Sequence, residues 1–176
     1  MVSDYKEILS DSAKGMKRSA IRELLKLTQK PEIISFAGGL PAKESFPLKQ
    51  LQEICAEVIA TDGAAACQYG STEGVPELLE ILAQRYRDQG LSYVTKENIT
   101  IITSSQQGLD TVGKIFLNRG DKYICELPSY LGALGAFNSY GGVGVGIPQD
   151  EQGMSAVELE KTLAEMKAKG EKPKFI

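Results

Sequence analysis

From residue 98 onward, apolar and polar residues follow two alternating periods that predict strands separated by helices. Asn98–Thr103 reads NITIIT, a short β-branched run typical of a strand, and apolar residues recur at helical spacing over Ser105–Asn118. The pattern then repeats to the C-terminus, with strands predicted at 122–125, 142–147 and 174–176 and helices at 129–140 and 155–169. Strands separated by helices of about 10 to 15 residues form β-α-β units. The sequence therefore predicts an α/β fold with a mostly parallel sheet.

The preceding part of the chain shows a helical pattern instead. Leu48–Ala60 and Pro76–Gly90 are predicted helices, joined by a Gly- and Ala-rich loop. Farther upstream, Ser19–Lys30 is amphipathic and basic, which predicts either a solvated helix packed on the body or an arm that reaches a partner subunit. A short strand-like run, 32–36, leads into the AGGLP segment 37–41, whose two glycines predict a turn with close approach of the main chain.

Composition and charge exclude several classes of function. The chain has 176 residues, 20 Lys and Arg against 23 Asp and Glu, and no His. A net charge of -3 gives no basic footprint for nucleic acid or an anionic membrane, and no apolar run reaches the roughly 18 residues of a membrane span. Without His, a His-based hydrolytic triad and His-ligated zinc are excluded within this chain. Cys55, Cys67 and Cys125 show no CxxC spacing, so we expect reduced, partly buried thiols in a cytoplasmic protein without a signal peptide.

The junction between the predicted strand 98–103 and the next helix, TSSQQG, is a candidate anion site. Free N–H groups at the start of a helix, the small Ser104 and Ser105 hydroxyls and the positive end of the helix dipole together favour a phosphate. This junction lies at the carboxyl end of a predicted parallel strand, where open α/β sheets bind ligands. The alternative is simple capping, because Ser104 and Gln107 have the spacing of a capping box. The spacing alone leaves both interpretations open.

Two tyrosines stand at positions where a ligand could be contacted. Tyr130, in the next strand-to-helix junction, could lay its ring against a flat cofactor, or it could fill the core of a loop. Tyr69, in the Gly-rich loop, could present its hydroxyl to a phosphate, or it could anchor that loop. The glycines of 142–146 form G-x-G-x-G inside a predicted strand with no helix opening after them. A nicotinamide-dinucleotide site is therefore disfavoured.

Four segments, taken in order, resemble one enzyme family. They are SFAGGLP with the following FP (35–47), QYGSTEGVPEL (68–78), TSSQQGL (103–109) and the stretch from GDK to PSY (120–130). Together they are similar to the pyridoxal-phosphate-dependent aminotransferases of classes I and II, which have fold type I. The branch that contains the 2-aminoadipate and kynurenine aminotransferases looks closest.

The resemblance implies a fold, a cofactor and roles for particular residues. It implies the N-terminal part of a three-layer α/β/α large domain over 48–176, preceded by an N-terminal arm and the start of a small domain over 1–47, in which Lys17–Lys30 helps to cover the active site. The activity implied is transfer of an amino group between an L-amino acid and a 2-oxo acid with pyridoxal phosphate, in a homodimer. The roles implied are phosphate binding by Ser105 and Gln106 beside Ser104, stacking on the pyridine ring by Tyr130, contact with the other subunit's phosphate by Tyr69, and substrate contact by Gly39.

The same resemblance implies that catalytic residues of the family are missing. Its Schiff-base lysine, the Asp at the pyridine nitrogen, an Asn at the ring oxygen and a carboxylate-binding Arg all fall after the position where this sequence ends, and Lys114 and Lys122 match none of them. The family also pairs strand 98–103 with a strand supplied much later in the chain. We therefore expect a truncated domain that binds the cofactor weakly and is inactive alone. The alternatives are another fold-type-I enzyme, such as a lyase or decarboxylase, and a non-catalytic aminotransferase-like regulatory domain.

Overall fold

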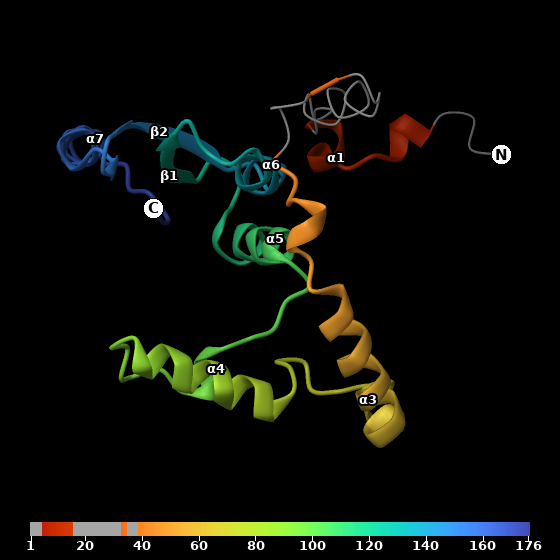
Figure 1. Ribbon diagram of the computed structural model, residues 1–176. Coiled ribbons are helices and arrows are strands. Elements are labelled where there is room, and N and C mark those ends of the chain that lie inside the picture. Colours follow the sequence, from red (N-terminus) through yellow and green to blue (C-terminus); the bar gives the residue numbers. More distant parts are fainter. Residues whose placement is uncertain (1–4, 16–32, 35–38) are drawn as a thin grey trace. The chain divides into compact units, whose positions relative to one another are not determined.

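The computed structural model describes residues 5–15, 33–34 and 39–176, and its elements are labelled in Figure 1. The chain divides into two compact units, each described by itself: a sheet unit (Met1–Lys17 and Ile102–Ile176) and a helical unit (Arg18–Ile101). The predicted helix 19–30, the covering role of 17–30 and most of the strand-like run 32–36 lie outside the described residues. The predicted division into an arm over 1–47 and a large domain over 48–176 stays a prediction.

Each unit has its own order of elements. The helical unit contains the 3-10 helix η2 (Lys43–Ser45), α3 (Leu48–Ala66), α4 (Pro76–Asp88) and the 3-10 helix η3 (Lys96–Asn98). The sheet unit contains η1 (Tyr5–Ile8), α1 (Asp11–Gly15), α5 (Ser105–Phe116), β1 (Lys122–Leu127), α6 (Leu131–Ser139), β2 (Val143–Asp150), β3 (Gly153–Met154) and α7 (Ala156–Ala168). The α/β alternation predicted after residue 104 is thus confirmed.

The sheet is built around β1. β1 pairs in parallel with β2, with Lys122 opposite Val143, and β2 pairs antiparallel with the short β3. On the other side of β1 the C-terminal segment runs parallel to it: the Lys174 N–H donates to the Lys122 carbonyl at 2.8 Å, and the Ile124 N–H donates to the Phe175 carbonyl at 3.0 Å. The predicted strand 174–176 is therefore present as a hydrogen-bonded extended segment, with one bridge, rather than as a full strand.

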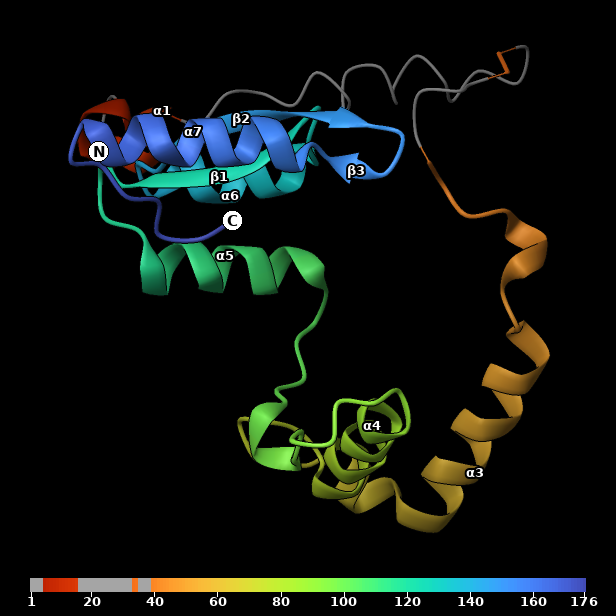
Figure 2. The same ribbon diagram turned by 90° about the vertical axis from the view of Figure 1, so that its left-hand side faces the viewer.

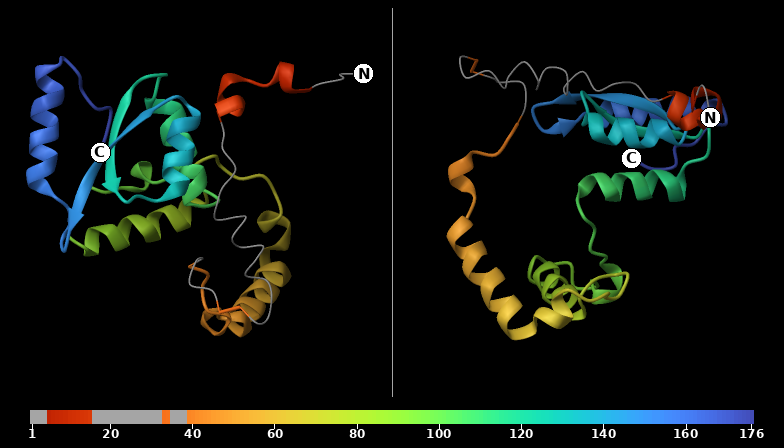
Figure 3. Two further views of the ribbon diagram at one scale, coloured as in Figure 1. Left: turned by 90° about the horizontal axis from the view of Figure 1, so that it is seen from above. Right: turned by 90° about the vertical axis from the view of Figure 1, so that its right-hand side faces the viewer.

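Helices cover both faces of this sheet, as Figures 2 and 3 show for α6 and α7. Successive side chains of a strand point to opposite faces. Tyr123 accordingly packs with Phe137 of α6 and with Phe175, at ring-centroid distances of 5.0 and 5.9 Å. Its neighbour Ile124 packs on the opposite face with Met166 of α7. The result is the three-layer α/β/α arrangement that the resemblance implied.

Glycines in β2 and directly before it make room for side chains on the sheet face that α6 covers. A Cβ built on Gly144 would lie 2.9 Å from the Tyr123 Oη, and one on Gly142 would lie 2.9 Å from the Leu117 Cδ1. The G-x-G-x-G segment therefore packs against Tyr123 and Leu117, with Gly142 directly before β2 and Gly144 and Gly146 within it. This is a steric reason for its composition that involves no nucleotide.

The predicted strand at 98–103 is wrong. Asn98 ends the 3-10 helix η3, and 99–103 pairs with no strand within the described part of the chain. Ile99 does have an extended backbone (φ -122°, ψ 137°), and the Ile101 N–H donates to the Glu73 carbonyl at 2.7 Å. A β-branched run favours extended backbone, but a strand also needs a neighbouring strand for its hydrogen bonds.

The helix predicted over Leu48–Ala60 is longer than expected. α3 continues to Ala66, with a non-helical break at Asp62 (φ -140°). Alanines 64–66 are the strongest helix formers and carry the helix past Gly63. The predicted loop is therefore confined to the residues from Cys67 to Val75, between α3 and α4.

Candidate functional site

The junction before α5 leaves the first turn of the helix without a side-chain cap. Ser104 is the N-cap residue, with extended backbone (φ -168°, ψ 171°), and its side chain makes no capping hydrogen bond. Gln107 bends back instead, and its Oε1 accepts a hydrogen bond from the Thr103 N–H at 2.6 Å. The alternative of a capping box between Ser104 and Gln107 is therefore wrong, because each of its two hydrogen bonds is missing or goes elsewhere.

The first amides of α5 are open to a ligand. Among the described residues, none accepts a hydrogen bond from the N–H of Ser105 or Gln106. The first turn of α5 carries no acidic side chain that would offset the helix dipole, and Ser104 and Ser105 are exposed. Unpaired amides, a positive helix end and nearby hydroxyls form a binding site suited to an anion. We call residues 104–106 the amide cradle.

Tyr130 lies beside this cradle. The Gln106 Nε2 donates a hydrogen bond to the Gly132 carbonyl at 3.2 Å, which joins the first turn of α5 to the first turn of α6. Tyr130 is the N-cap residue of α6, and its ring packs against the Cα of Gly132 on the side where the Gln106 amide lies. The Tyr130 residue is 63% exposed, so its ring is accessible. The structure thus brings Ser104, Ser105, Gln106 and Tyr130 together.

A second set of contacts holds the middle of α5 against the C-terminal end of α6. The Tyr140 Oη donates to the Asp110 Oδ2 at 3.1 Å. A Cβ on Gly113 would lie 2.9 Å from the Tyr140 Cδ2, so this glycine allows the two helices to approach closely. Burial and the nearby Asp110 carboxylate raise the pKa of Tyr140, which keeps its hydroxyl protonated as the donor.

Tyr69 and Gly39 belong to the helical unit. Tyr69 is 99% exposed, and its only hydrogen bond to a described residue is donated by its backbone N–H to the Gln68 Oε1 at 2.8 Å. Gly39 is exposed, and a Cβ built on it would meet no described atom within 4 Å. Their predicted roles, contact with a partner's phosphate and contact with a substrate, stay predictions.

The lysines named at the sequence level lie away from the amide cradle. Lys114 is in the last turn of α5, nine residues and about 13 Å along the helix from Ser105. Lys122 begins β1 and forms an ion pair with Glu171, about 16 Å along the strand from the carboxyl end that leads to Tyr130. Neither ammonium group therefore lies next to the cradle.

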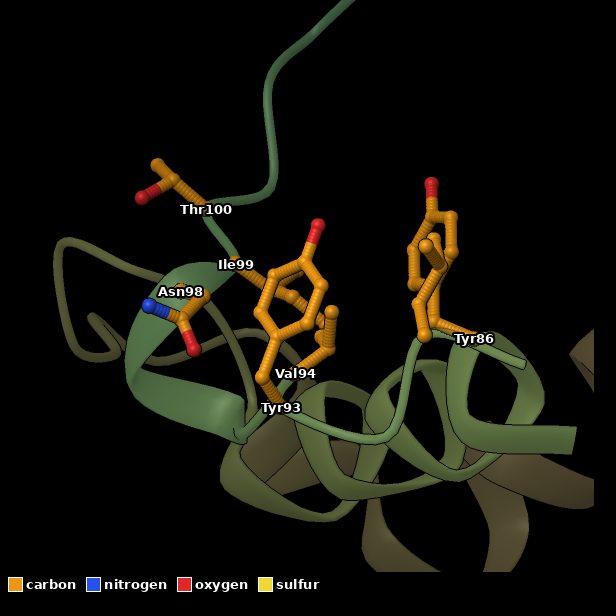
Figure 4. A pocket seen from close by; sticks show the side chains of 7 residues that line it. Tyr86, Tyr93, Val94, Asn98, Ile99 and Thr100 are labelled. Carbon is orange, nitrogen blue, oxygen red and sulfur yellow. The ribbon is translucent and has the colours of Figure 1, made fainter. Parts of the chain in front are cut away.

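Two hollows accompany these elements, one in each unit. In the sheet unit, a hollow of about 490 Å³ lies by the carboxyl half of β1. It is lined mainly by apolar side chains, with Glu126 and Ser129 as polar members. In the helical unit, a shallow hollow of about 400 Å³ lies between the end of α4 and η3, where the Tyr86 and Tyr93 hydroxyls point to the same side (Figure 4). Tyr86 and Tyr93, on either side of Gly90, are the sequence feature that could have predicted this second hollow.

The cysteines are free, and two of them are exposed. Cys55 and Cys67 are exposed rather than partly buried as expected, because α3, which carries Cys55, has no buried residue. Cys125 is half-buried in β1, and burial raises the pKa of its thiol. Within residues 5–15, 33–34 and 39–176 there is no acidic or Cys cluster that could hold a metal, and no helix there is long and apolar enough to span a membrane.

Comparisons with known proteins show which family this chain is similar to. Residues 31–176 match the family model "Aminotransferase class I and II". The chain is 43% identical over 173 residues to the aromatic-amino-acid aminotransferase 1 of Thermococcus litoralis, and 41% identical over 172 residues to the 2-aminoadipate transaminase of Thermus thermophilus. It covers only 42% and 41% of the length of these two relatives, although they cover 98% of this chain.

The similarity extends to the solved structures. The kynurenine aminotransferase of Pyrococcus horikoshii, solved in complex with PMP, superposes with a TM-score of 0.85 at 39% identity, over 98% of this chain and 42% of that one. The α-aminoadipate aminotransferase of Thermus thermophilus, complexed with N-(5'-phosphopyridoxyl)-L-leucine, gives a TM-score of 0.81 at 38% identity. The fold is therefore a partial fold-type-I domain, and the chain belongs to the class I and II aminotransferase family.

Proposed function

We propose that this chain provides the phosphate-binding and ring-stacking part of a pyridoxal-phosphate-dependent aminotransferase. The enzyme would move an amino group between an L-amino acid and a 2-oxo acid. The observation that carries the proposal is the uncapped first turn of α5 beside the exposed ring of Tyr130. The family membership of the chain supports the same conclusion.

The residues present fit the phosphate of this cofactor. A phosphate dianion needs several donors and a positive potential, and the free amides of Ser105 and Gln106 at the start of α5 meet both needs. The hydroxyls of Ser104 and Ser105 and the Gln106 side-chain amide can add donors, because they are exposed at the same turn. No acidic side chain in this turn would repel the dianion.

The aromatic part of the cofactor would be bound by Tyr130. Its ring belongs to the N-cap of α6, which the Gln106 side chain ties to the cradle. Offset stacking of an aromatic side chain on a planar ring adds about 0.5–1.5 kcal/mol beyond the area that is buried. When bound, pyridoxal phosphate supplies an electron sink for charge that develops at the amino-acid Cα. The residues of this chain bind the cofactor and orient its ring.

Two further roles involve the helical unit and a second subunit. Tyr69 would donate its hydroxyl to the phosphate that the partner subunit of a homodimer binds, and its 99% exposure supports a role outside its own unit. Gly39 would lie against the substrate, and the absence of any described atom within 4 Å of a Cβ built on it supports a close approach.

The 176-residue chain would show no transamination by itself. Lys114 lies about 13 Å along α5 from the cradle, and Lys122 is paired with Glu171 at the amino end of β1. Neither is placed to form the covalent bond to the cofactor or to move a proton at the substrate Cα. Measurable turnover by the purified chain would contradict this part of the proposal.

Binding of pyridoxamine phosphate tests the central claim, since this form of the cofactor binds without a covalent bond. Isothermal titration should show that the chain binds pyridoxamine phosphate at least about tenfold more tightly than pyridoxamine, because charge-assisted hydrogen bonds to the phosphate are strong. Ser105→Asp should abolish this preference, because the new carboxylate occupies the anion site while remaining favourable for the helix dipole. Tyr130→Ala should weaken the binding of pyridoxamine phosphate, and pyridoxamine should not become the preferred ligand.

Ala156→Asp is the matched control, because it places the same charge at the first residue of another helix, α7. There the side chain of the N-cap Ser155 already accepts a hydrogen bond from the Glu158 N–H. It should bind pyridoxamine phosphate like the wild-type chain. Equal affinity of the wild-type chain for pyridoxamine and its phosphate, or unchanged phosphate preference in Ser105→Asp, would refute the proposed cradle.

A further inference from the structure

Gly132 occupies a position where no backbone requirement explains a glycine. It lies in the first turn of α6, Leu131–Ser139. Its φ is not among the positive values found at other glycines of the described chain, such as Gly141 and Gly170. Any residue could adopt its helical backbone, and alanine favours a helix more than glycine does. The reason for a glycine must therefore come from what lies over its Cα.

The space over the Cα of Gly132 is filled by the two side chains that we assign to the cofactor. A Cβ built there would lie 2.7 Å from the Tyr130 Cζ and 2.6 Å from the Gln106 Oε1, and it would overlap the Tyr130 Cε1. The carbonyl of the same residue accepts the hydrogen bond from the Gln106 Nε2 at 3.2 Å. The Tyr130 ring and the Gln106 side chain thus both pack against the main chain of Gly132.

We propose that Gly132 is a positioning residue that sets the Tyr130 ring and the Gln106 amide at their places beside the amide cradle. This inference rests on the proposed function, because it concerns how that same site holds the cofactor. Gly132 offers no functional group of its own. It acts through the two side chains that lie on it, and a methyl group at its Cα would push one or both of them away.

The neighbours of Gly132 are able to move, and this separates a positioning role from a structural one. Tyr130 is 63% exposed and Gln106 is an exposed, flexible side chain, so both can swing into solvent. A methyl group would therefore be accommodated with little loss of packing, while the helix propensity of α6 would rise. The penalty should appear in cofactor binding rather than in folding.

Gly135 provides a matched control on the same helix. It is exposed, it lies three residues after Gly132, and a Cβ built on it would meet no atom of the described residues within 4 Å. Gly135→Ala therefore changes helix propensity in the same way as Gly132→Ala, without touching the site.

The experiment compares the wild-type 176-residue chain with Gly132→Ala and Gly135→Ala. Isothermal titration should show pyridoxamine phosphate binding at least about tenfold weaker in Gly132→Ala and within about twofold of wild type in Gly135→Ala, because displacement of binding groups by about 1 Å is costly. Both variants should have melting temperatures equal to or above that of the wild type. In Gln106→Ala, the added Gly132→Ala change should cost less than it does alone, because one of the displaced groups is already absent.

A readout without ligand keeps the inference separate from the proposed function. In 15N-resolved NMR spectra, the Gln106 side-chain amide signals should shift in Gly132→Ala and stay in place in Gly135→Ala. Unchanged affinity and unchanged amide signals in Gly132→Ala would overturn the positioning role while leaving the cradle intact. A wild-type chain without preference for the phosphate would overturn the proposed function, and the amide signals would then still decide whether Gly132 positions Gln106.

Discussion

Gly144→Ala is the sharpest test of how the sheet and the α6 layer fit together. The new Cβ would lie 2.9 Å from the Tyr123 Oη and 3.0 Å from its Cζ, closer than such contacts normally allow. Tyr123 cannot swing away, because it is 1% exposed and its ring packs against both Phe137 and Phe175, which also contact each other. Its hydroxyl also donates to the Asn138 Oδ1 at 3.0 Å. The sheet or the ring must therefore shift.

The expected cost follows from two opposing effects. Overpacking a core typically costs about 1–3 kcal/mol. Replacing a strand glycine by alanine returns about 0.5–1 kcal/mol, because the unfolded chain loses conformational freedom. We expect a net destabilisation of about 1–2 kcal/mol, which lowers the urea midpoint, followed by circular dichroism, by about 0.5–1 M.

A double-mutant cycle checks that the Tyr123 ring is the cause. Tyr123→Phe removes the atom nearest to the new methyl group, so Tyr123→Phe with Gly144→Ala should be less destabilised than the sum of the two single changes, by about 0.5 kcal/mol. Gly135→Ala, whose new methyl group would meet no described atom within 4 Å, should not lower stability. A neutral or stabilising Gly144→Ala, or strict additivity in the cycle, would show that Tyr123 does not lie over Gly144.

Three further outcomes are expected. Ile147→Ala should lower the free energy of unfolding by about 2–5 kcal/mol in urea denaturation, because Ile147 is 1% exposed and its loss leaves a cavity under α7; a loss below about 1 kcal/mol would contradict this packing. The Asn118 N–H donates to the Asp121 carboxylate at 2.8 Å and lowers the pKa of that carboxyl. The ionised Asp121 therefore stabilises the fold above about pH 4, and this contribution is lost as the pH falls through the lowered pKa. Asp121→Asn should therefore reduce stability at pH 7, and the stability of this variant should fall less steeply with decreasing pH than that of the wild type. Curves of stability against pH that run parallel for the two proteins would contradict the stabilising role of the Asp121 carboxylate. With Ellman's reagent, two thiols per chain should react quickly and Cys125 slowly, because burial shields Cys125 and raises the pKa of its thiol; Cys125 reacting as fast as the other two would place it outside the sheet core.

Much of the local structure followed from the sequence. The periodicity located α5, α6 and α7 and the parallel strands β1 and β2, because each element buries one face and its pattern repeats with the period of a helix or strand. The same reasoning failed at 98–103. Its residues favour an extended backbone, but whether that backbone forms a strand depends on a neighbouring strand that the segment itself does not specify.

The candidate site shows the same division. The residue types of the TSSQQG and PSY segments predicted a phosphate site at Ser104 and Ser105 and a ligand-facing ring at Tyr130, because small hydroxyls at a helix start and an aromatic at the next junction suit a phosphorylated planar ligand. Gln106 was added only by the family resemblance. The spacing could not decide between phosphate binding and capping. The geometry of Gln107, which bonds to Thr103 and leaves the first turn of α5 open, excluded the capping box.

The chain by itself therefore determined which segments are helical or extended and which residue types could meet a phosphate, since these depend on neighbours in sequence. Only the tertiary structure brought Gln106 to Gly132, 26 residues away, and placed Tyr130 over the same glycine. It also placed Tyr123 across Gly144. Such contacts depend on how close two main chains approach each other, and that distance is set by the packing of whole elements rather than by any local pattern.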